Sequence, residues 1–106
     1  MRKTLEPRAR GKALMQGLNL SGLVGPYVLY DVDLTRSNLT RSNLAGSRFV
    51  RCTFTRADLS FSDLRGAIFH SCRFRGTKFV DADLRGAEFH ACDFDGCNFT
   101  VARGVP

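Results

Sequence analysis

The sequence lacks the features of a membrane-spanning or secreted protein. No apolar run approaches the length of about 18 residues that marks a membrane-spanning helix. The first eight residues read Met-Arg-Lys-Thr-Leu-Glu-Pro-Arg, and no apolar core follows them, as a secretory signal would require. These absences predict a cytoplasmic protein without a membrane span.

Catalytic motifs are also absent, and cysteine is sparse. There is no P-loop, no Gly-x-Ser-x-Gly and no His-Glu-x-x-His sequence. The number of cysteines is even, which in a secreted peptide would suggest disulfide bridges. They are Cys52, Cys72, Cys92 and Cys97.

Acidic residues are scarce in the N-terminal half. The 106 residues support one domain and carry a net charge of +6. Residues 1–30 contain five basic side chains against one acidic, and residues 31–60 contain five against three, whereas the remainder balances at six against six. The positive field therefore belongs to the N-terminal half and favours an acidic protein or a nucleic acid as partner.

A repeat with a five-residue period dominates the sequence. All fourteen positions of one series are Leu or Phe, and a second series two residues earlier holds small side chains at all but its first position, Val32. Such a period fits neither a 3.6-residue helix nor simple strand alternation. Residues two apart point to the same side of an extended segment, so both series point inward. The predicted core series is Leu34, Leu39, Leu44, Phe49, Phe54, Leu59, Leu64, Phe69, Phe74, Phe79, Leu84, Phe89, Phe94 and Phe99.

A second period of twenty residues shows how the sides close. Phe-His-Ser-Cys-Arg-Phe at 69–74 recurs as Phe-His-Ala-Cys-Asp-Phe at 89–94, and Arg-Gly-Ala at 65–67 recurs at 85–87. Four five-residue sides therefore make one coil, and successive coils stack at the interstrand spacing of about 4.8 Å. Gly46, Gly66 and Gly86 form a column at a corner where a tight turn requires positive φ. The sequence predicts an all-β, four-sided solenoid of about 3.5 to 4 coils.

The repeat units resemble the A(D/N)LXX signature of pentapeptide-repeat proteins over about residues 32–101. The units that carry the resemblance include Ser-Asn-Leu-Ala-Gly at 42–46, Ala-Asp-Leu-Ser-Phe at 57–61 and Ala-Asp-Leu-Arg-Gly at 82–86. The resemblance implies a right-handed quadrilateral β-helix. It also implies the roles of the family's best understood members, which are acidic dimeric rods that mimic B-DNA and engage DNA gyrase in quinolone resistance and toxin immunity. The present chain departs from that pattern because its net charge is positive.

The two ends fall outside the regular repeat. Residues 1–31 break register, since Leu20 lies fourteen residues before Leu34 instead of fifteen, and we expect a loop around Gly25–Pro26 to absorb the slip. This segment is predicted to form a cap or an irregular first coil, with a short helix or turn over residues 4–16. Residues 102–106 form a C-terminal tail that is too short for a helical cap. We therefore expect the exposed layer of Phe94 and Phe99 to be an oligomer interface, giving a homodimer through the C-terminal end.

Cysteine and histidine side chains are candidates for metal or redox chemistry. The sequence pattern favours a structural role for the cysteines and a solvent-facing position for the histidines. Cys52, Cys72 and Cys92 take the small inward position in successive coils, so we expect core-filling free thiols in a reducing compartment. His70 and His90 project outward one above the other, and with a carboxylate they would suit Zn²⁺. Because each Cys points inward and each His outward, they cannot share an ion. No metal or cofactor site is predicted, and the two histidines are kept as candidates for contact with a partner.

Two groups of exposed side chains are candidates for partner binding. Arg36, Arg41, Arg51 and Arg56 stand at coil corners, with Arg36 and Arg56 in one column, and they form a ridge suited to phosphates or to simple solubility. Phe61 and Val80 are adjacent outward apolar residues. Phe61 stacks over Arg41, so we expect a cation–π contact between them.

The expected function is binding without catalysis. A rod filled by Leu and Phe has no water-excluding pocket in which catalytic groups converge. The leading interpretation is a scaffold module that presents flat faces to a protein or anionic partner. The alternatives are a regulator that interacts with gyrase or topoisomerase, disfavoured by the positive charge, and a nucleic-acid binder that uses the basic patch.

Overall fold

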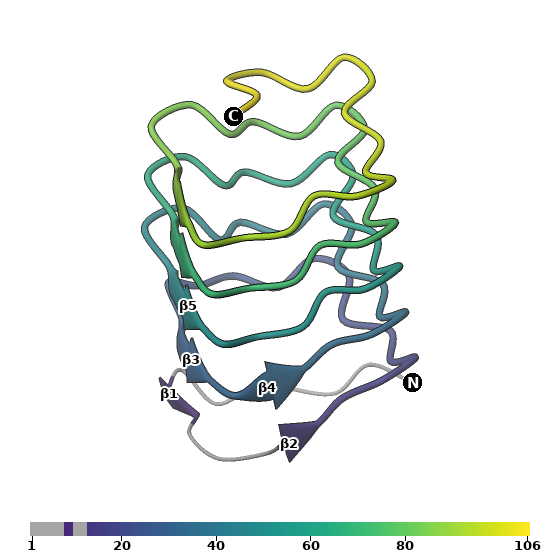
Figure 1. Ribbon diagram of the computed structural model, residues 1–106, viewed down its shortest axis with the longest axis vertical. Coiled ribbons are helices and arrows are strands. Elements are labelled where there is room, and N and C mark those ends of the chain that lie inside the picture. The colour runs from purple at the N-terminus through teal and green to yellow at the C-terminus, as the bar shows by residue number, and fades with distance from the viewer. Residues whose placement is uncertain (1–7, 10–12) are drawn as a thin grey trace.

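The structure is a computed structural model that describes residues 8–9 and 13–106. The chain winds as a four-sided coil whose turns stack along one axis, with the C-terminus at one end of the stack (Figure 1). The described residues form short strands, isolated bridges, turns and loops. None of them belongs to a helix that could cross a membrane. The predicted quadrilateral β-solenoid is confirmed.

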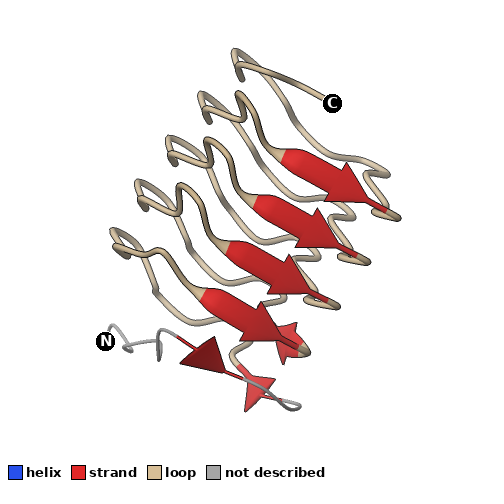
Figure 2. Ribbon diagram, turned by 90° about the vertical axis from the view of Figure 1, so that its left-hand side faces the viewer, coloured by secondary structure: helices blue, strands red, loops and turns tan. Residues whose placement is uncertain are grey.

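One wall of the solenoid forms a parallel sheet of five short strands, stacked one above another (Figure 2). A second, adjacent wall carries a two-stranded parallel sheet, and the remaining walls are joined by single parallel bridges. The five-stranded sheet contains β1 (Arg8–Ala9), β3 (Val28–Tyr30), β5 (Arg48–Val50), β6 (Ile68–His70) and β7 (Glu88–His90), and the two-stranded sheet contains β2 (Ala13–Leu14) and β4 (Val32–Asp33).

The register of the strands follows the twenty-residue period. Val28 pairs with Arg48, Arg48 with Ile68 and Ile68 with Glu88. The stack also continues past residue 101, because Arg103 bridges to Asp83. With β1 and β2 added at the other end, the coil is longer than the repeat region alone.

The predicted register slip lies at Gly25–Pro26, a cis peptide bond. Val24 pairs with Asn43, nineteen residues on, whereas Val28 pairs with Arg48, twenty residues on. One corner of this coil is therefore a residue shorter than the same corner above it. The expectation that a loop here absorbs the slip is confirmed.

The short corner also explains two large side chains at inward positions where the next coil holds serine. Gly25 stands where Leu44 stands one coil later, so a large side chain is missing from the interior. Leu23 and Tyr27 flank Gly25 and are each 6% exposed, and they supply the missing volume. A Cβ on Gly25 would lie 3.0 Å from the Tyr27 ring and 2.9 Å from the Tyr27 amide nitrogen, so the position is closed to larger residues.

The N-terminal segment differs from its prediction where it is described. Residues 8–9 and 13–14 pair as strands with β3 and β4, where a short helix or turn was expected over residues 4–16. Edge backbone groups of the first regular coil offer a hydrogen-bonding partner, which outweighs weak helix propensity near Pro7 and Gly11. Residues 4–7 and 10–12 of that range lie outside the described residues.

The core consists of stacked Leu and Phe columns, as the fivefold pattern predicts. From Leu34 to Leu84 every residue of the predicted core series is at most 2% exposed, and Phe89, Phe94 and Phe99 are partly buried in the last coil. Phe49 and Phe69 stack with ring centroids 4.9 Å apart, and Phe54 and Phe69 meet edge to face at 6.0 Å. Both geometries are favourable for aromatic pairs.

The corners of the coil use one backbone solution. At three of the four corners a turn closes with a hydrogen bond from the third residue after the core residue back to its carbonyl, as from Ser37 N–H to Leu34 O at 3.0 Å. The second residue after the core residue has positive φ, whether it is glycine (Gly66, +68°) or not (Arg36, +59°). Asp or Asn before the core residue accepts a hydrogen bond from the turn, as Asp63 does from Arg65 N–H at 3.1 Å. That role for the aspartates is confirmed at each of Asp33, Asp58, Asp63 and Asp83.

Candidate binding surfaces on the corners

A groove of about 550 Å³ runs along one corner of the solenoid, and three of its eight lining residues are arginines. We call this surface the basic corner groove. It lies where the wall of the Leu34–Phe54–Phe74–Phe94 column turns into the next wall. Its residues are Thr35, Arg36, Thr55, Arg56, Arg75, Gly76, Asp95 and Gly96.

The repeat places these side chains in two parallel columns. Arg36, Arg56, Gly76 and Gly96 follow one another at the positive-φ position, with φ between +58° and +71°. The backbone N–H of Arg36 donates to Thr55 O at 2.9 Å, and that of Arg56 donates to Arg75 O at 2.8 Å. Each arginine is therefore held one coil from the next, with its guanidinium free to reach outward.

Arg36 and Arg56 are exposed and form no ion pair with the described carboxylates. Arg75 lies between Asp93 and Asp95, with nitrogen–oxygen distances of 3.9 Å to each. Such long, exposed contacts hold the guanidinium loosely. The groove thus has two unpaired cations at its N-terminal end and a carboxylate, Asp95, toward its C-terminal end.

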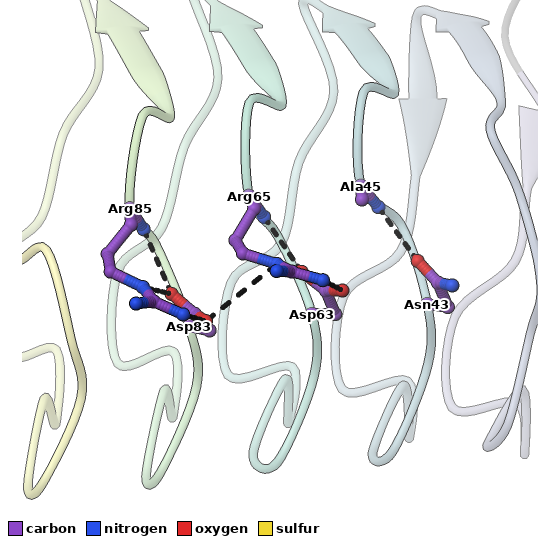
Figure 3. A network of polar contacts seen from close by, with 6 residues as sticks. All are labelled: Asn43, Ala45, Asp63, Arg65, Asp83 and Arg85. Carbon is purple, nitrogen blue, oxygen red and sulfur yellow. Dashed lines mark hydrogen bonds and ion pairs between the residues drawn. The ribbon is translucent and has the colours of Figure 1, made fainter.

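The glycine corner carries the opposite arrangement. We use this name for the corner formed by Gly46, Gly66 and Gly86 together with Ala45, Arg65 and Arg85, which precede them. Figure 3 shows each arginine folded back onto the aspartate of its own turn: Arg65 contacts Asp63 at 2.8 Å and Arg85 contacts Asp83 at 2.6 Å. Arg65 also lies 3.8 Å from Asp83 of the next coil. Sequence reasoning missed this ladder, although its signal, Asp-Leu-Arg at 63–65 and again at 83–85, is present.

The hydrogen bonds of this ladder change the acidity of its carboxyls. The Arg85 guanidinium, which donates to Asp83, lowers the pKa of that carboxyl to about 2, and Arg65 lowers the pKa of Asp63 in the same way. The positive charge of each arginine is therefore balanced by an aspartate of its own turn. They contribute little free positive charge to the surface.

Arg51 and Arg41, the other predicted ridge arginines, lie at other corners than the basic corner groove. Arg51 makes two hydrogen bonds to Asp31, at 2.7 and 3.0 Å, and this contact raises the pKa of the guanidinium. Arg41 lies over the Phe61 ring with 4.8 Å from its guanidinium carbon to the ring centroid, so the expected cation–π contact is confirmed. The basic corner groove therefore contains two of the four predicted arginines, Arg36 and Arg56.

Phe61 is a bulky residue in a conformation that side chains rarely adopt. Its φ is +62° and its side chain is 49% exposed. Its N–H donates to the carbonyl of Val80 at 2.8 Å, which places the predicted apolar pair side by side. Val80 is partly buried, so the apolar surface at this corner is small.

His70 and His90 stack on the outer face of the five-stranded sheet. Their ring centroids are 5.9 Å apart, and Nε2 of His90 lies 3.0 Å from the Glu88 carboxylate. Among the described residues, no group of three or more His, Cys, Asp or Glu side chains is placed to hold a metal ion.

The four cysteines are free thiols on the inner side of the coil. Hydrogen bonding with Cys52 and Cys92, together with burial, raises the pKa of Cys72. At the C-terminal end, the hydrogen bond with Cys72 lowers the pKa of half-buried Cys92 to about 7, whereas burial raises the pKa of Cys97 to about 11. Cys92 is therefore the more reactive thiol of this end.

The C-terminal end of the stack is open. Phe94 and Phe99 are only partly buried because no further coil covers them, and Val101 is 69% exposed beside them. Among the described residues nothing accepts a hydrogen bond from the backbone N–H of Phe94 or Phe99, groups that donate to the next coil in every earlier turn. This end therefore presents both apolar surface and unpaired strand edge.

The repeat geometry agrees with known sequences and structures. The sequence model of the pentapeptide repeat region matches residues 28–99, well over half of the chain. The chain belongs to the pentapeptide repeat family. A comparison with curated protein sequences gives no significant match.

Solved structures of pentapeptide repeat proteins share the fold. Rfr23 from the cyanobacterium Cyanothece 51142 is 18% identical, with 93% of this chain and 88% of that chain covered and a TM-score of 0.74. A thylakoid-lumen protein of Arabidopsis thaliana is 28% identical, with 95% and 69% covered and a TM-score of 0.71. A trypsin-treated form of QnrB1, a plasmid-mediated fluoroquinolone resistance protein, is 18% identical, with 94% and 59% covered and a TM-score of 0.73. This chain thus spans little more than half of that QnrB1 chain.

Proposed function

We propose that the chain is a non-enzymatic binding module that presents the corners and flat faces of its solenoid to a protein or anionic partner. The observation that carries this proposal is that Arg36 and Arg56 line one groove and form no ion pair with the described carboxylates, whereas Arg51, Arg65 and Arg85 are paired with aspartates. Unpaired surface cations supply binding free energy to an anionic partner without first losing an internal ion pair.

The interior supports binding over catalysis. The core is filled by Leu and Phe, and each buried side-chain nitrogen or oxygen among the described residues has a hydrogen-bond partner within the fold. Buried Ser62 and Thr77, for example, donate to the carbonyls of Leu39 and Phe54. Polar side chains inside the coil are therefore used for structure, and the outward ones diverge from four walls.

The first test follows DNA supercoiling by purified gyrase across a titration of this protein, with the mobility of free DNA followed in the same gels. Binding to an anionic duplex predicts retardation of free DNA that weakens steeply as salt rises. Inhibition or drug protection of gyrase without retardation would instead favour the gyrase-directed role of the second candidate. An absence of both effects would leave an acidic protein as the partner to be sought.

We also propose that two copies pair through the open C-terminal end. The support is the coincidence there of partly buried Phe94 and Phe99 with unpaired backbone donors. Sedimentation at high micromolar concentration is expected to show a dimer, and Phe99→Glu is expected to shift it to monomer. A strict monomer for the unmodified protein would contradict this proposal without affecting the basic corner groove.

The thiols bear on location. Four free cysteines, two of them buried, suit a reducing compartment. These free thiols support our proposal that the protein is cytoplasmic.

A further inference from the structure

We propose that the basic corner groove is a binding site for a single dianionic phosphate group, held between the guanidiniums of Arg36 and Arg56. This inference deepens the proposed function, on which it rests, by naming the anion that the groove accepts. It is carried by the spacing of the two cations, their lack of internal partners, the space above them and the charge at the far end of the groove.

The spacing suits one phosphate group. The two arginines stand in one column on successive coils, about 4.8 Å apart in backbone position. A guanidinium presents donors in a planar fork that matches phosphate oxygens two at a time. A tetrahedral phosphate between the two forks can accept from both at once, with different oxygens.

The guanidinium groups of both Arg36 and Arg56 are available to bind a ligand. Arg51, Arg65 and Arg85 each donate two hydrogen bonds to an aspartate at 2.6–3.0 Å, while Arg36 and Arg56 have no ion pair in the described structure. A ligand at the groove therefore displaces water from these two guanidiniums and no carboxylate. The hydroxyl of Thr55, which lines the groove in the coil of Arg56, adds a donor, whereas that of Thr35 is used by Asp33 at 2.6 Å.

Glycine makes room for the ligand. Gly76 and Gly96 continue the column above Arg56, so these two positions add no side chain of their own to the groove. A Cβ on Gly76 would lie 3.3 Å from Cγ of Arg56, which shows that the stem of Arg56 lies across this glycine. A larger residue at position 76 would push against the side chain that the site requires.

The charge pattern favours one compact anion over a long polyanion. A nucleic-acid strand that followed the column would meet Gly76 and then Asp95, which repels phosphate. Arg75, the third cation, is already shared between Asp93 and Asp95. A phosphate monoester carries a charge of about −1.5 to −2 at neutral pH, whereas each phosphodiester of a nucleic acid carries one, so two free guanidiniums match the monoester better.

The test is a titration of the ¹⁵N-labelled 106-residue chain with inorganic phosphate, followed by NMR at constant ionic strength maintained with sodium chloride. Saturable shifts are expected at the amides of Thr55, Arg56 and Gly76. In the double variant R36Q/R56Q affinity is expected to fall by at least about tenfold, because two charge-assisted hydrogen-bonding groups are lost. The matched control R48Q/K78Q removes the same charge from two exposed side chains outside the groove and should leave affinity within about twofold.

A parallel titration with adenosine 5′-monophosphate distinguishes the sources of the phosphate. Equal affinities identify the free ion as sufficient, and tighter binding of the nucleotide identifies a small phosphomonoester; either result supports the site. Non-saturating shifts, or equal weakening by the two double variants, would overturn the proposal. If R36Q/R56Q bound phosphate as tightly as the unmodified chain does, while the unmodified chain retarded DNA or bound a protein partner, the phosphate site would be wrong and the binding function would stand. Melting curves of both variants check that the fold is intact.

Discussion

The basic corner groove and the glycine corner are built on the same turn, yet they carry different residues. At the glycine corner, positive φ is taken by Gly46, Gly66 and Gly86, and the nearby arginines fold onto Asp63 and Asp83. At the basic corner groove, the positive-φ positions 36 and 56 hold arginine, and neither arginine forms an ion pair with a described carboxylate. A non-glycine residue in this conformation costs about 1–2 kcal/mol. By that measure, the turns at Arg36 and Arg56 carry a conformational cost that the glycine turns of the glycine corner avoid.

Removal of the core beneath the basic corner groove should have the largest effect. Phe74→Ala empties the layer between Phe54 and Phe94, whose rings stack on it at 5.0 and 5.4 Å, so the free energy of unfolding should fall by about 3–5 kcal/mol. Denaturant unfolding measures the loss. Phe94→Ala is the control at the partly buried end and should cost clearly less. Equal losses would contradict the burial gradient along the column.

A side chain at the glycine corner should reproduce the strain of the other corner. Gly66 has φ of +68° and open space where a Cβ would stand, so Gly66→Ala tests conformation without a clash. The free energy of unfolding is expected to fall by about 1–2 kcal/mol. A thermal or denaturant melt unchanged by the substitution would mean that the turn relaxes at no cost.

The reverse change at the basic corner groove should stabilise the fold. Arg56→Gly relieves the strain at φ of +58°, less the entropy that glycine loses on folding, for a net gain of about 0.5–1 kcal/mol. Arg48→Gly, in strand β5, lacks the strain and should instead destabilise by about 0.5–1 kcal/mol. The two melts should move in opposite directions. Destabilisation by Arg56→Gly would show that the arginine stem contributes packing that exceeds its strain.

The smallest effect concerns the titration of the paired carboxyls. Because Arg85 lowers the pKa of Asp83 from its ordinary value of 3.8 to about 2, the pair stabilises the fold above pH 3.8 and this contribution is lost as pH falls toward 2. NMR of the carboxyl carbon should show the low midpoint, and Arg85→Gln should return it toward the ordinary value. A midpoint near 3.8 in the unmodified protein would contradict the ladder drawn in Figure 3.

The interior could be predicted from sequence because the repeat is one-dimensional. Leu or Phe recurs every fifth residue, which predicts the sides of the coil. Each twenty-residue segment resembles the next, which predicts how the coils stack, so no contact between dissimilar distant segments has to be predicted. The slip at Gly25–Pro26 could be predicted by counting, and the turn role of Asp63 follows from residue type.

The corners were harder to predict. Nothing about arginine signals positive φ, so the conformation of Arg36 and Arg56 became visible only when their turns were seen to repeat that of the glycines. The groove depends on an absent side chain at Gly76 and on which arginines reach a carboxylate, and neither is a property of a single position. The strands at residues 8–9 and 13–14 were missed because the edge of the next coil decides them, not their own pattern.

Because the register is regular, the position of a residue in the sequence determines which wall of the solenoid it lies on. Each five residues turn the chain by a quarter of a revolution, so residues twenty apart, such as Arg48 and Ile68, face the same way. A deletion of five residues would keep the core pattern but move every later side chain to the neighbouring wall. A deletion of twenty residues would leave each later side chain on its own wall. The shortened coil at Gly25–Pro26 loses one residue without losing its heading, since Val28 faces the same way as Arg48. The number of residues between two positions thus sets the angle between the directions that they face. Unless a corner absorbs the change, as at Gly25–Pro26, a surface such as the basic corner groove persists only when insertions and deletions come in multiples of twenty residues.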